Sequence, residues 1–108
     1  AAADLPALAA DLVRLRVDVI VTSGYPGNKA AKDATTSIPI VMATSGDAVQ
    51  EGLVASLARP GGNITGVTAW IGGMGFAGKW MELLKEVVPD VSHVAVLSNS
   101  ANPACAPA

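Results

Sequence analysis

The sequence predicts an α/β protein built around a parallel sheet, and two observations support this fold class. Segments with helical periodicity alternate with short aliphatic runs of strand type along most of the chain. Of the 108 residues, 51% are hydrophobic and only 15% are charged, which is typical of parallel strands that are covered by helices. Alternation of this kind favours right-handed crossovers between neighbouring parallel strands.

The first predicted helix begins after Asp4, whose side chain can cap a helix start. The segment that follows carries leucines at three- and four-residue steps, as one face of a helix requires. These leucines are Leu5, Leu8, Leu12 and Leu15. The sequence therefore predicts a surface helix with one apolar face near the amino end.

Two aliphatic runs, residues 19–21 and 38–43, are predicted to be fully buried strands. Both end in small polar residues. Between them, residues 24–37 contain an early proline followed by an alanine-rich stretch. This composition favours a short helix that packs closely on the sheet.

A further helix is predicted over residues 47–58, where apolar residues recur every four positions and Asp47 and Gln50 form a capping pair. The stretch ARPGGN at residues 58–63 would end this helix. Its proline lacks an amide donor, and its glycines allow the left-handed conformations that reverse a chain. A strand is predicted to follow over residues 63–69.

The last predicted helix covers residues 76–87 and precedes Pro89. Its charged residues fall on one side and its apolar residues on the other, as expected for a helix packed on a core. The apolar residues are Phe76, Trp80, Leu83, Leu84 and Val87. A final buried strand is predicted over residues 93–99.

Composition argues against several classes of function. The net charge is −2 and the cations are scattered, so we expect no nucleic-acid binding. No apolar run approaches the roughly 18 residues of a membrane span. Residues 1–10 lack the basic start and sustained apolar core of a targeting segment. The single Cys105 cannot form an internal disulfide.

The stretch GMGFAG at residues 73–78 matches the Gly-x-Gly-x-x-Gly pattern of dinucleotide sites. The preceding strand ends too early for this motif, however, and Ser98 and Asn99 stand where a ribose-binding acid would be expected. We therefore interpret it as a glycine-rich bridge before a helix and expect no nucleotide cofactor.

Candidate catalytic and metal-binding groups are sparse. His93 is the only histidine, it has no second histidine or cysteine for a metal site, and we expect it at the surface. No Gly-x-Ser-x-Gly elbow is present, and the position of Asp47 favours a helix cap over an acid-base role. The sequence thus predicts neither catalysis nor a metal.

Small polar residues follow the predicted strands and could form a ligand site. Ligands of open parallel sheets bind at the carboxyl ends of the strands, where helix N-termini present free amides. The candidate residues are Ser23, Gly24, Tyr25, Thr44, Ser45, Asp47, Thr68 and Asn99. Strand-to-helix loops also favour such residues without any ligand, and the sequence leaves the two interpretations open.

Three segments together resemble the ABC transporter substrate-binding protein family. They are LVRLRVDVIVTSG (residues 12–24), IPIVMATSGDAVQEGLVASLARPGGNITGV (residues 38–67) and GKWMELLKEVVPDVSHVAVLSNSANP (residues 78–103). The second contains the family signature Leu-Ala-Arg-Pro-Gly-Gly-Asn-x-Thr-Gly. Two positions depart from the family pattern: Asp47-Ala48 replaces a frequent Asp-Pro, and Ser98 replaces a frequent aromatic residue.

The resemblance implies a type I periplasmic-binding fold, in which two α/β lobes, each a three-layer sandwich with a parallel sheet, close on a small ligand. On that pattern, residues 1–90 would be the later part of the first lobe and residues 91–108 the start of a truncated second lobe. A partial lobe of this kind leaves strand edges unpaired, so we expect the 108-residue fragment to self-associate.

The function that the resemblance implies is solute capture for an ABC importer. The protein would bind a small molecule, such as an amino acid, and deliver it to membrane permease subunits, without performing chemistry. Its location would be periplasmic or membrane-anchored and extracytoplasmic. The alternatives are the ligand-binding effector domain of a transcription regulator and, third, a fragment of a nucleotide-cofactor enzyme.

Overall fold

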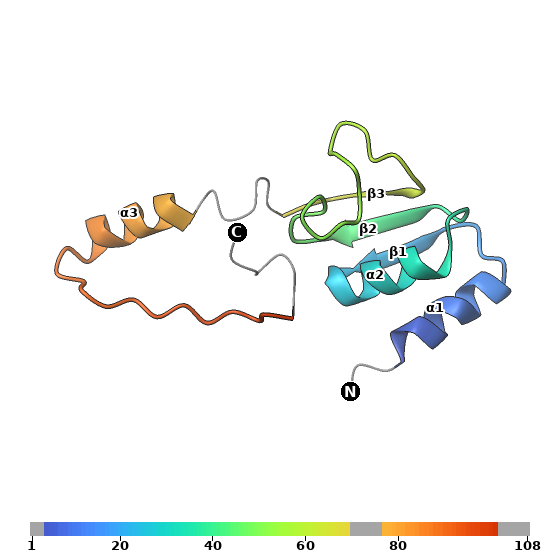
Figure 1. Ribbon diagram of the computed structural model, residues 1–108, viewed down its shortest axis with the longest axis horizontal. Coiled ribbons are helices and arrows are strands. Elements are labelled where there is room, and N and C mark those ends of the chain that lie inside the picture. Colours follow the sequence, from blue (N-terminus) through green and yellow to red (C-terminus); the bar gives the residue numbers. More distant parts are fainter. Residues whose placement is uncertain (1–3, 70–76, 102–108) are drawn as a thin grey trace.

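The computed structural model describes residues 4–69 and 77–101, and it confirms the predicted parallel α/β arrangement (Figure 1). Three parallel strands form one sheet in the order β1-β2-β3. The elements in chain order are α1 (Leu5–Arg14), β1 (Ile20–Ser23), α2 (Gly24–Ala34), β2 (Ile40–Thr44), β3 (Ile64–Gly66) and α3 (Ala77–Val87).

The strand register separates the two faces of the sheet. Ile20 pairs with Ile40, and Ile40 pairs with Ile64, and all three side chains are at most 5% exposed. The next residues along the first two strands point the other way: Val21 is 70% exposed and Val41 is 36% exposed. The prediction that these strands are fully buried was therefore wrong, because only one face of the sheet is covered within the described residues.

The covered face holds the hydrophobic core. Helix α2 lies across β1 and β2 and contributes Ala31, and α1 lies beside α2 (Figure 1). Small alanines let the helix backbone approach the sheet closely, as the alanine-rich composition predicted. The buried core residues are Ile20, Ala31, Ile40, Met42, Ala48, Leu53 and Ile64.

Helix α1 confirms the predicted cap. The Asp4 carboxylate accepts a hydrogen bond of 3.3 Å from the amide of Ala7. The helix buries Ala9, however, while Leu8 and Leu12 remain 50% and 38% exposed. The apolar repeat thus predicted the helix but not the part of it that is buried.

The helix predicted over residues 47–58 is wrong: the structure forms a single turn. Gly52 adopts the left-handed φ of +73°, the amide of Leu53 bonds to the carbonyl of Ala48 at 2.9 Å, and that of Gly52 bonds to Val49 at 3.0 Å. This pair of backbone hydrogen bonds is the usual arrangement where a glycine ends a helix. Leu53 then turns into the core, whereas Val49 and Leu57, the other members of the four-residue apolar repeat, are 43% and 46% exposed.

The ARPGGN stretch forms a loop at the amino end of β3. The carbonyl of Pro60 accepts a 3.0 Å bond from Ala55, and Gly61 has a φ of +82°. The side-chain amide of Asn63 donates to the carbonyls of Thr35 and Ile38 at 3.3 and 2.8 Å. Asn63 therefore ties this loop to the segment that enters β2, and the strand start predicted after the loop is confirmed in a shorter form.

The last predicted helix is confirmed as α3, whereas the strand predicted over residues 93–99 is wrong. Residues 91–99 have no regular secondary structure, and Val96 and Leu97 are 73% and 101% exposed. A strand needs a neighbouring strand for its backbone hydrogen bonds, and among the described residues none lies beside this segment.

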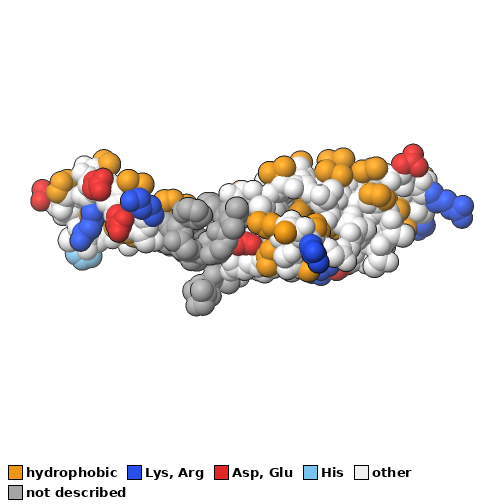
Figure 2. Space-filling view, turned by 90° about the horizontal axis from the view of Figure 1, so that it is seen from above, with side chains coloured by type: hydrophobic (Ala, Val, Ile, Leu, Met, Phe, Trp, Pro, Cys, Tyr) orange, Lys and Arg blue, Asp and Glu red, His pale blue; other side chains and the backbone are white. Residues whose placement is uncertain are grey.

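Helix α3 lies apart from the sheet in Figure 1. Its residues Trp80 and Leu83, predicted to be part of a packed face, are each 46% exposed. The radius of gyration is 17.0 Å, compared with about 13 Å for a compact chain of this length. Figure 2 shows hydrophobic side chains on the surface of both regions. No helix among the described residues has the length and apolar character to cross a membrane.

Candidate ligand site at the carboxyl edge of the sheet

The carboxyl ends of β1 and β2 and the exit of β3 meet at one edge of the sheet, as the parallel topology requires. Polar residues that the sequence singled out lie here in two groups. One is at the start of α2, and the other is in the loops that leave β2 and β3. That these residues bind a ligand stays a prediction.

The start of α2, whose first backbone amides have no partner within the helix itself, lies at this edge. Ser23 is the N-cap residue, but its side chain makes no capping hydrogen bond to the helix and is exposed. Gly24 has a φ of +75°, which lets the chain turn directly from strand into helix, and Tyr25 is half-buried beside it. The positive end of the helix dipole therefore points toward this edge.

The loop after β2 combines one exposed and two buried polar side chains. Thr44 is exposed at the end of the strand. Ser45 is 2% exposed, and its hydroxyl donates to the carbonyl of Val67 at 3.2 Å. Asp47 is 6% exposed and accepts bonds from the amides of Val49 and Gln50 at 3.1 and 3.0 Å. The capping role predicted for Asp47 is confirmed, although the cap starts only one turn.

Thr68 connects this loop to the exit of β3. Its hydroxyl donates to the carbonyl of Gly46 at 2.6 Å and accepts from the amide of Ala48 at 3.3 Å. The side chains of Ser45, Asp47 and Thr68 thus hold the loops in place. Ser23, Tyr25 and Thr44 are the candidates with side chains more open to a ligand.

Asn99 does not follow a strand, contrary to the prediction, but it still lies near Tyr25. Its side-chain oxygen accepts a 3.0 Å bond from the amide of Ala101. Asn99 and Ala101 line an open groove of about 620 Å³ together with Tyr25, Pro26 and the first turn of α1. The groove brings two candidate residues together, on the outer side of α2.

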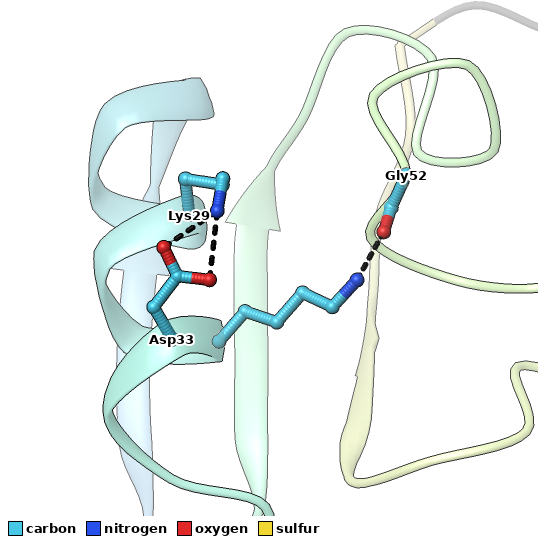
Figure 3. Close-up of polar contacts among 4 residues, drawn as sticks. Lys29, Asp33 and Gly52 are labelled. Carbon is cyan, nitrogen blue, oxygen red and sulfur yellow. Dashed lines mark hydrogen bonds and ion pairs between the residues drawn. The ribbon is translucent and has the colours of Figure 1, made fainter.

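An ion pair borders this groove. Lys29 donates to both carboxylate oxygens of Asp33, one turn further along α2, with distances of 2.7 and 2.5 Å (Figure 3). The hydrogen bond that Lys29 donates to Asp33 raises the pKa of Lys29. Both side chains are about half exposed, so the pair adds little to stability.

Two buried polar residues at this edge escaped the sequence analysis. Asn28 is 1% exposed, and its side-chain amide donates to the carbonyl of Thr44 at 3.1 Å. Glu51 is 6% exposed and accepts from the amide of Gly46 at 3.3 Å. An asparagine within an alanine-rich helix face was a usable signal for Asn28. Glu51 lies within the segment that was predicted to be a helix, and that helix does not form.

The remaining features weighed in the sequence are the single histidine, possible metal ligands and the GMGFAG stretch. His93 is exposed as predicted and contacts the hydroxyl of Ser92 at 2.9 Å. In the part of the chain that the structure describes, no cluster of three metal-ligating side chains occurs. Residues 73–76 of the GMGFAG stretch lie outside the described residues.

A family model described as "ABC transporter substrate binding protein" matches residues 1–108. The chain belongs to this family. It is 34% identical over 100 residues to a tyrosine-binding protein of Clostridioides difficile (strain R20291), a match that covers 90% of the chain. The chain spans only 28% of that relative's length.

Solved structures of similar proteins show the same fold. A ligand-free, open substrate-binding protein with adhesive properties from Clostridium difficile has a TM-score of 0.64 at 31% identity, over 80% of this chain and 28% of its own. A domain from Streptococcus pneumonia in complex with L-Trp has a TM-score of 0.58 at 33% identity, over 59% of this chain and 22% of its own. The type I binding-protein fold predicted from the sequence is thus confirmed for the part present.

Proposed function

We propose that this chain forms one wall of an amino-acid site in a solute-binding protein. The observation that carries the proposal is the charge arrangement at the carboxyl edge. The uncapped start of α2 favours a carboxylate, and the buried acidic residue Asp47 on the next loop favours an ammonium group. A zwitterion satisfies both. The ligands named for two similar proteins, tyrosine and L-Trp, have this chemistry.

The side chain of the ligand would contact Tyr25. This residue is half-buried at the start of α2, and its ring offers an apolar surface with a polar end. Ser23 and Thr44, at the ends of neighbouring strands, would donate hydroxyl hydrogen bonds. An aromatic amino acid therefore fits this edge better than a small polar one.

Delivery to a membrane permease is the role we propose for the bound ligand, with no chemical step. This follows from membership of the family and from the site itself, where the candidate polar side chains hold loops in place. We place the protein outside the cytoplasm on the same grounds.

Isothermal titration of the purified protein with the twenty amino acids tests this proposal. We expect saturable binding of L-Trp or L-Tyr, and weaker binding of tryptamine and indole-3-propionate, each of which lacks one charged group. Tyr25→Ala should weaken binding roughly tenfold, which corresponds to the loss of one aromatic contact. Ser92→Ala, remote from the edge, is the control. A protein that binds none of the amino acids would disprove the proposal.

We also propose that the isolated 108-residue chain self-associates, a second copy covering its bare sheet face. Val21 and Val67 on or beside the strands are 70% and 61% exposed, and Trp80 and Leu83 of α3 form a second uncovered apolar surface. Contiguous exposed apolar surface often marks a protein–protein interface. Sedimentation velocity at tens of micromolar should show a dimer or larger species, and a compact monomer would contradict this.

A further inference from the structure

Gly46 is fixed at both of its peptide groups where the chain leaves β2. Its amide donates to Oε1 of Glu51 at 3.3 Å. Its carbonyl accepts from the hydroxyl of Thr68 at 2.6 Å and from the amide of Ala69 at 3.1 Å. These bonds connect the exits of β2 and β3. The Gly46 peptide directly follows Thr44 and Ser45, the last residues of the chain before this connection.

Glu51 reaches Gly46 from the single turn that begins at Asp47. Its own amide bonds to the carbonyl of Asp47 at 2.8 Å, which places the two carboxylates on the same turn. The side chain of Glu51 is 6% exposed, and its second oxygen, Oε2, is buried without a hydrogen-bond partner among residues 4–69 and 77–101. A buried carboxylate oxygen without a partner is costly.

The surroundings of Glu51 offer little compensation. On its own turn, Asp47 carries a charge of the same sign. From α2, Lys32 extends to this segment, but its ammonium contacts the carbonyl of Gly52 (Figure 3). From the exit of β3, Thr68 presents only a neutral hydroxyl.

The pKa of Glu51 reflects this balance. Burial raises it most, the charge of Asp47 raises it further, and the bond from Gly46 lowers it, so that the pKa lies above its ordinary value. The folded chain therefore binds this proton more tightly than the unfolded chain. The ionised side chain lowers the free energy of unfolding as pH rises through the raised pKa.

We propose that Glu51 is a positioning residue of the amino-acid site, whose carboxylate fixes the Gly46 peptide and thereby the Thr44–Ser45 loop against which the ligand binds. This inference rests on the proposed function. A charged acceptor holds an amide more strongly than a neutral one. The carboxylate therefore makes the loop at the edge more rigid, while its buried charge lowers the stability of the folded chain. Functional sites commonly retain groups of this kind.

Glu51→Gln tests the proposal because it keeps the shape and the acceptor but removes the charge. At pH 8 we expect L-Trp or L-Tyr to bind roughly three- to tenfold more weakly, as a charged hydrogen bond becomes a neutral one. The melting temperature should rise, because the buried charge is gone. A residue with only a structural role would change affinity and stability in the same direction. Glu82→Gln, an exposed carboxylate on α3, should change neither.

The pH dependence gives a second measurement. As pH falls through the raised pKa of Glu51, the wild-type affinity should weaken toward that of Glu51→Gln, whose affinity should stay constant. The Gly46 amide proton resonance should shift over the same range in the wild-type protein only, with or without ligand.

The outcomes separate the two proposals. If the wild-type protein binds amino acids and Glu51→Gln binds them equally well, the inference about Glu51 is wrong and the proposed function stands. If the wild-type protein binds no amino acid, the proposed function fails and the positioning role fails with it. A Gly46 resonance that ignores pH would show that Glu51 does not hold this peptide.

Discussion

The two faces of the sheet are built from the same three strands but have opposite environments. On the inner face, Ile20, Ile40 and Ile64 stand side by side and are at most 5% exposed. On the outer face, Val21 and Val41 also stand side by side and are 70% and 36% exposed. Both sets consist of β-branched aliphatic residues. Each valine of the outer face directly follows an isoleucine of the inner face along its strand.

This comparison shows that the type of a strand residue does not determine whether its side chain is buried. The inner face is covered because α2 and the turn after Asp47 bring Ala31, Ala48 and Leu53 over it. Along the described chain, no helix is seated on the outer face (Figure 1). A valine on either face has the same intrinsic preference for a strand, and its energetic contribution depends on what packs against it.

The largest loss of stability is expected from a substitution where β3 meets β2, because both faces of the sheet depend on this contact. Gly66 has a φ of +139°, and a Cβ atom there would lie 2.6 Å from the amide nitrogen of Met42 and closer still to its carbonyl oxygen. We expect Gly66→Ala to lower the free energy of unfolding by at least about 3 kcal/mol in urea denaturation.

Gly62→Ala is the matched control for Gly66→Ala. A Cβ atom at Gly62 meets nothing within 4 Å, and its φ is not in the left-handed range. A small change at Gly62 and a large one at Gly66 would confirm the close approach of the two strands. Equal effects would contradict it.

Adjacent residues of β2 compare the two faces directly. Ile40→Ala should cost about 3–4 kcal/mol, because Ile40 is fully buried and its loss leaves a cavity in the core. Val41→Ala should cost less than about 1 kcal/mol, because its side chain is already in contact with solvent. Urea denaturation of both variants measures the difference. A cost at Val41 equal to that at Ile40 would show that another part of the protein covers the outer face.

A charge introduced on the outer face tests whether a second copy of the chain covers that face. Val21→Lys places an ammonium group on the bare face without disturbing the core, so stability should change little. If a second copy covers this face, the substitution should reduce the sedimentation coefficient to that of a monomer. Thr36→Lys, at an exposed loop position beyond α2, serves as control. Unchanged association of Val21→Lys would place the contact elsewhere.

The smallest change in stability is expected from a substitution on the outer surface of α2. Asp33→Asn removes the exposed partner of Lys29 and should leave the urea midpoint unchanged. The pKa of Lys29, which Asp33 raises, should fall toward its ordinary value in an NMR titration of the lysine side chain. A Lys29 pKa that does not move would mean that the pair is not formed in solution.

Several local features could be predicted because their causes lie within a few residues. Asp4 caps α1 since its carboxylate reaches the amide of Ala7, three positions along. The aliphatic runs became β1 and β2, and the alanine-rich segment between them became α2. The wrong helix after Asp47 also has a local cause: the left-handed Gly52 outweighed an apolar repeat that we had interpreted as helical.

The sequence by itself therefore determined the parallel α/β class, the relative order of the helices and strands that form, and the edge at which polar residues gather. Only the tertiary structure decided which polar groups at that edge hold loops, as Ser45 and Thr68 do, and which remain open, as Ser23 and Thr44 do. It also decided which strand face is covered. Hydrogen-bond partners and packing neighbours come from segments distant along the chain, and alternating residues of one strand carry no information about which of them those segments will meet.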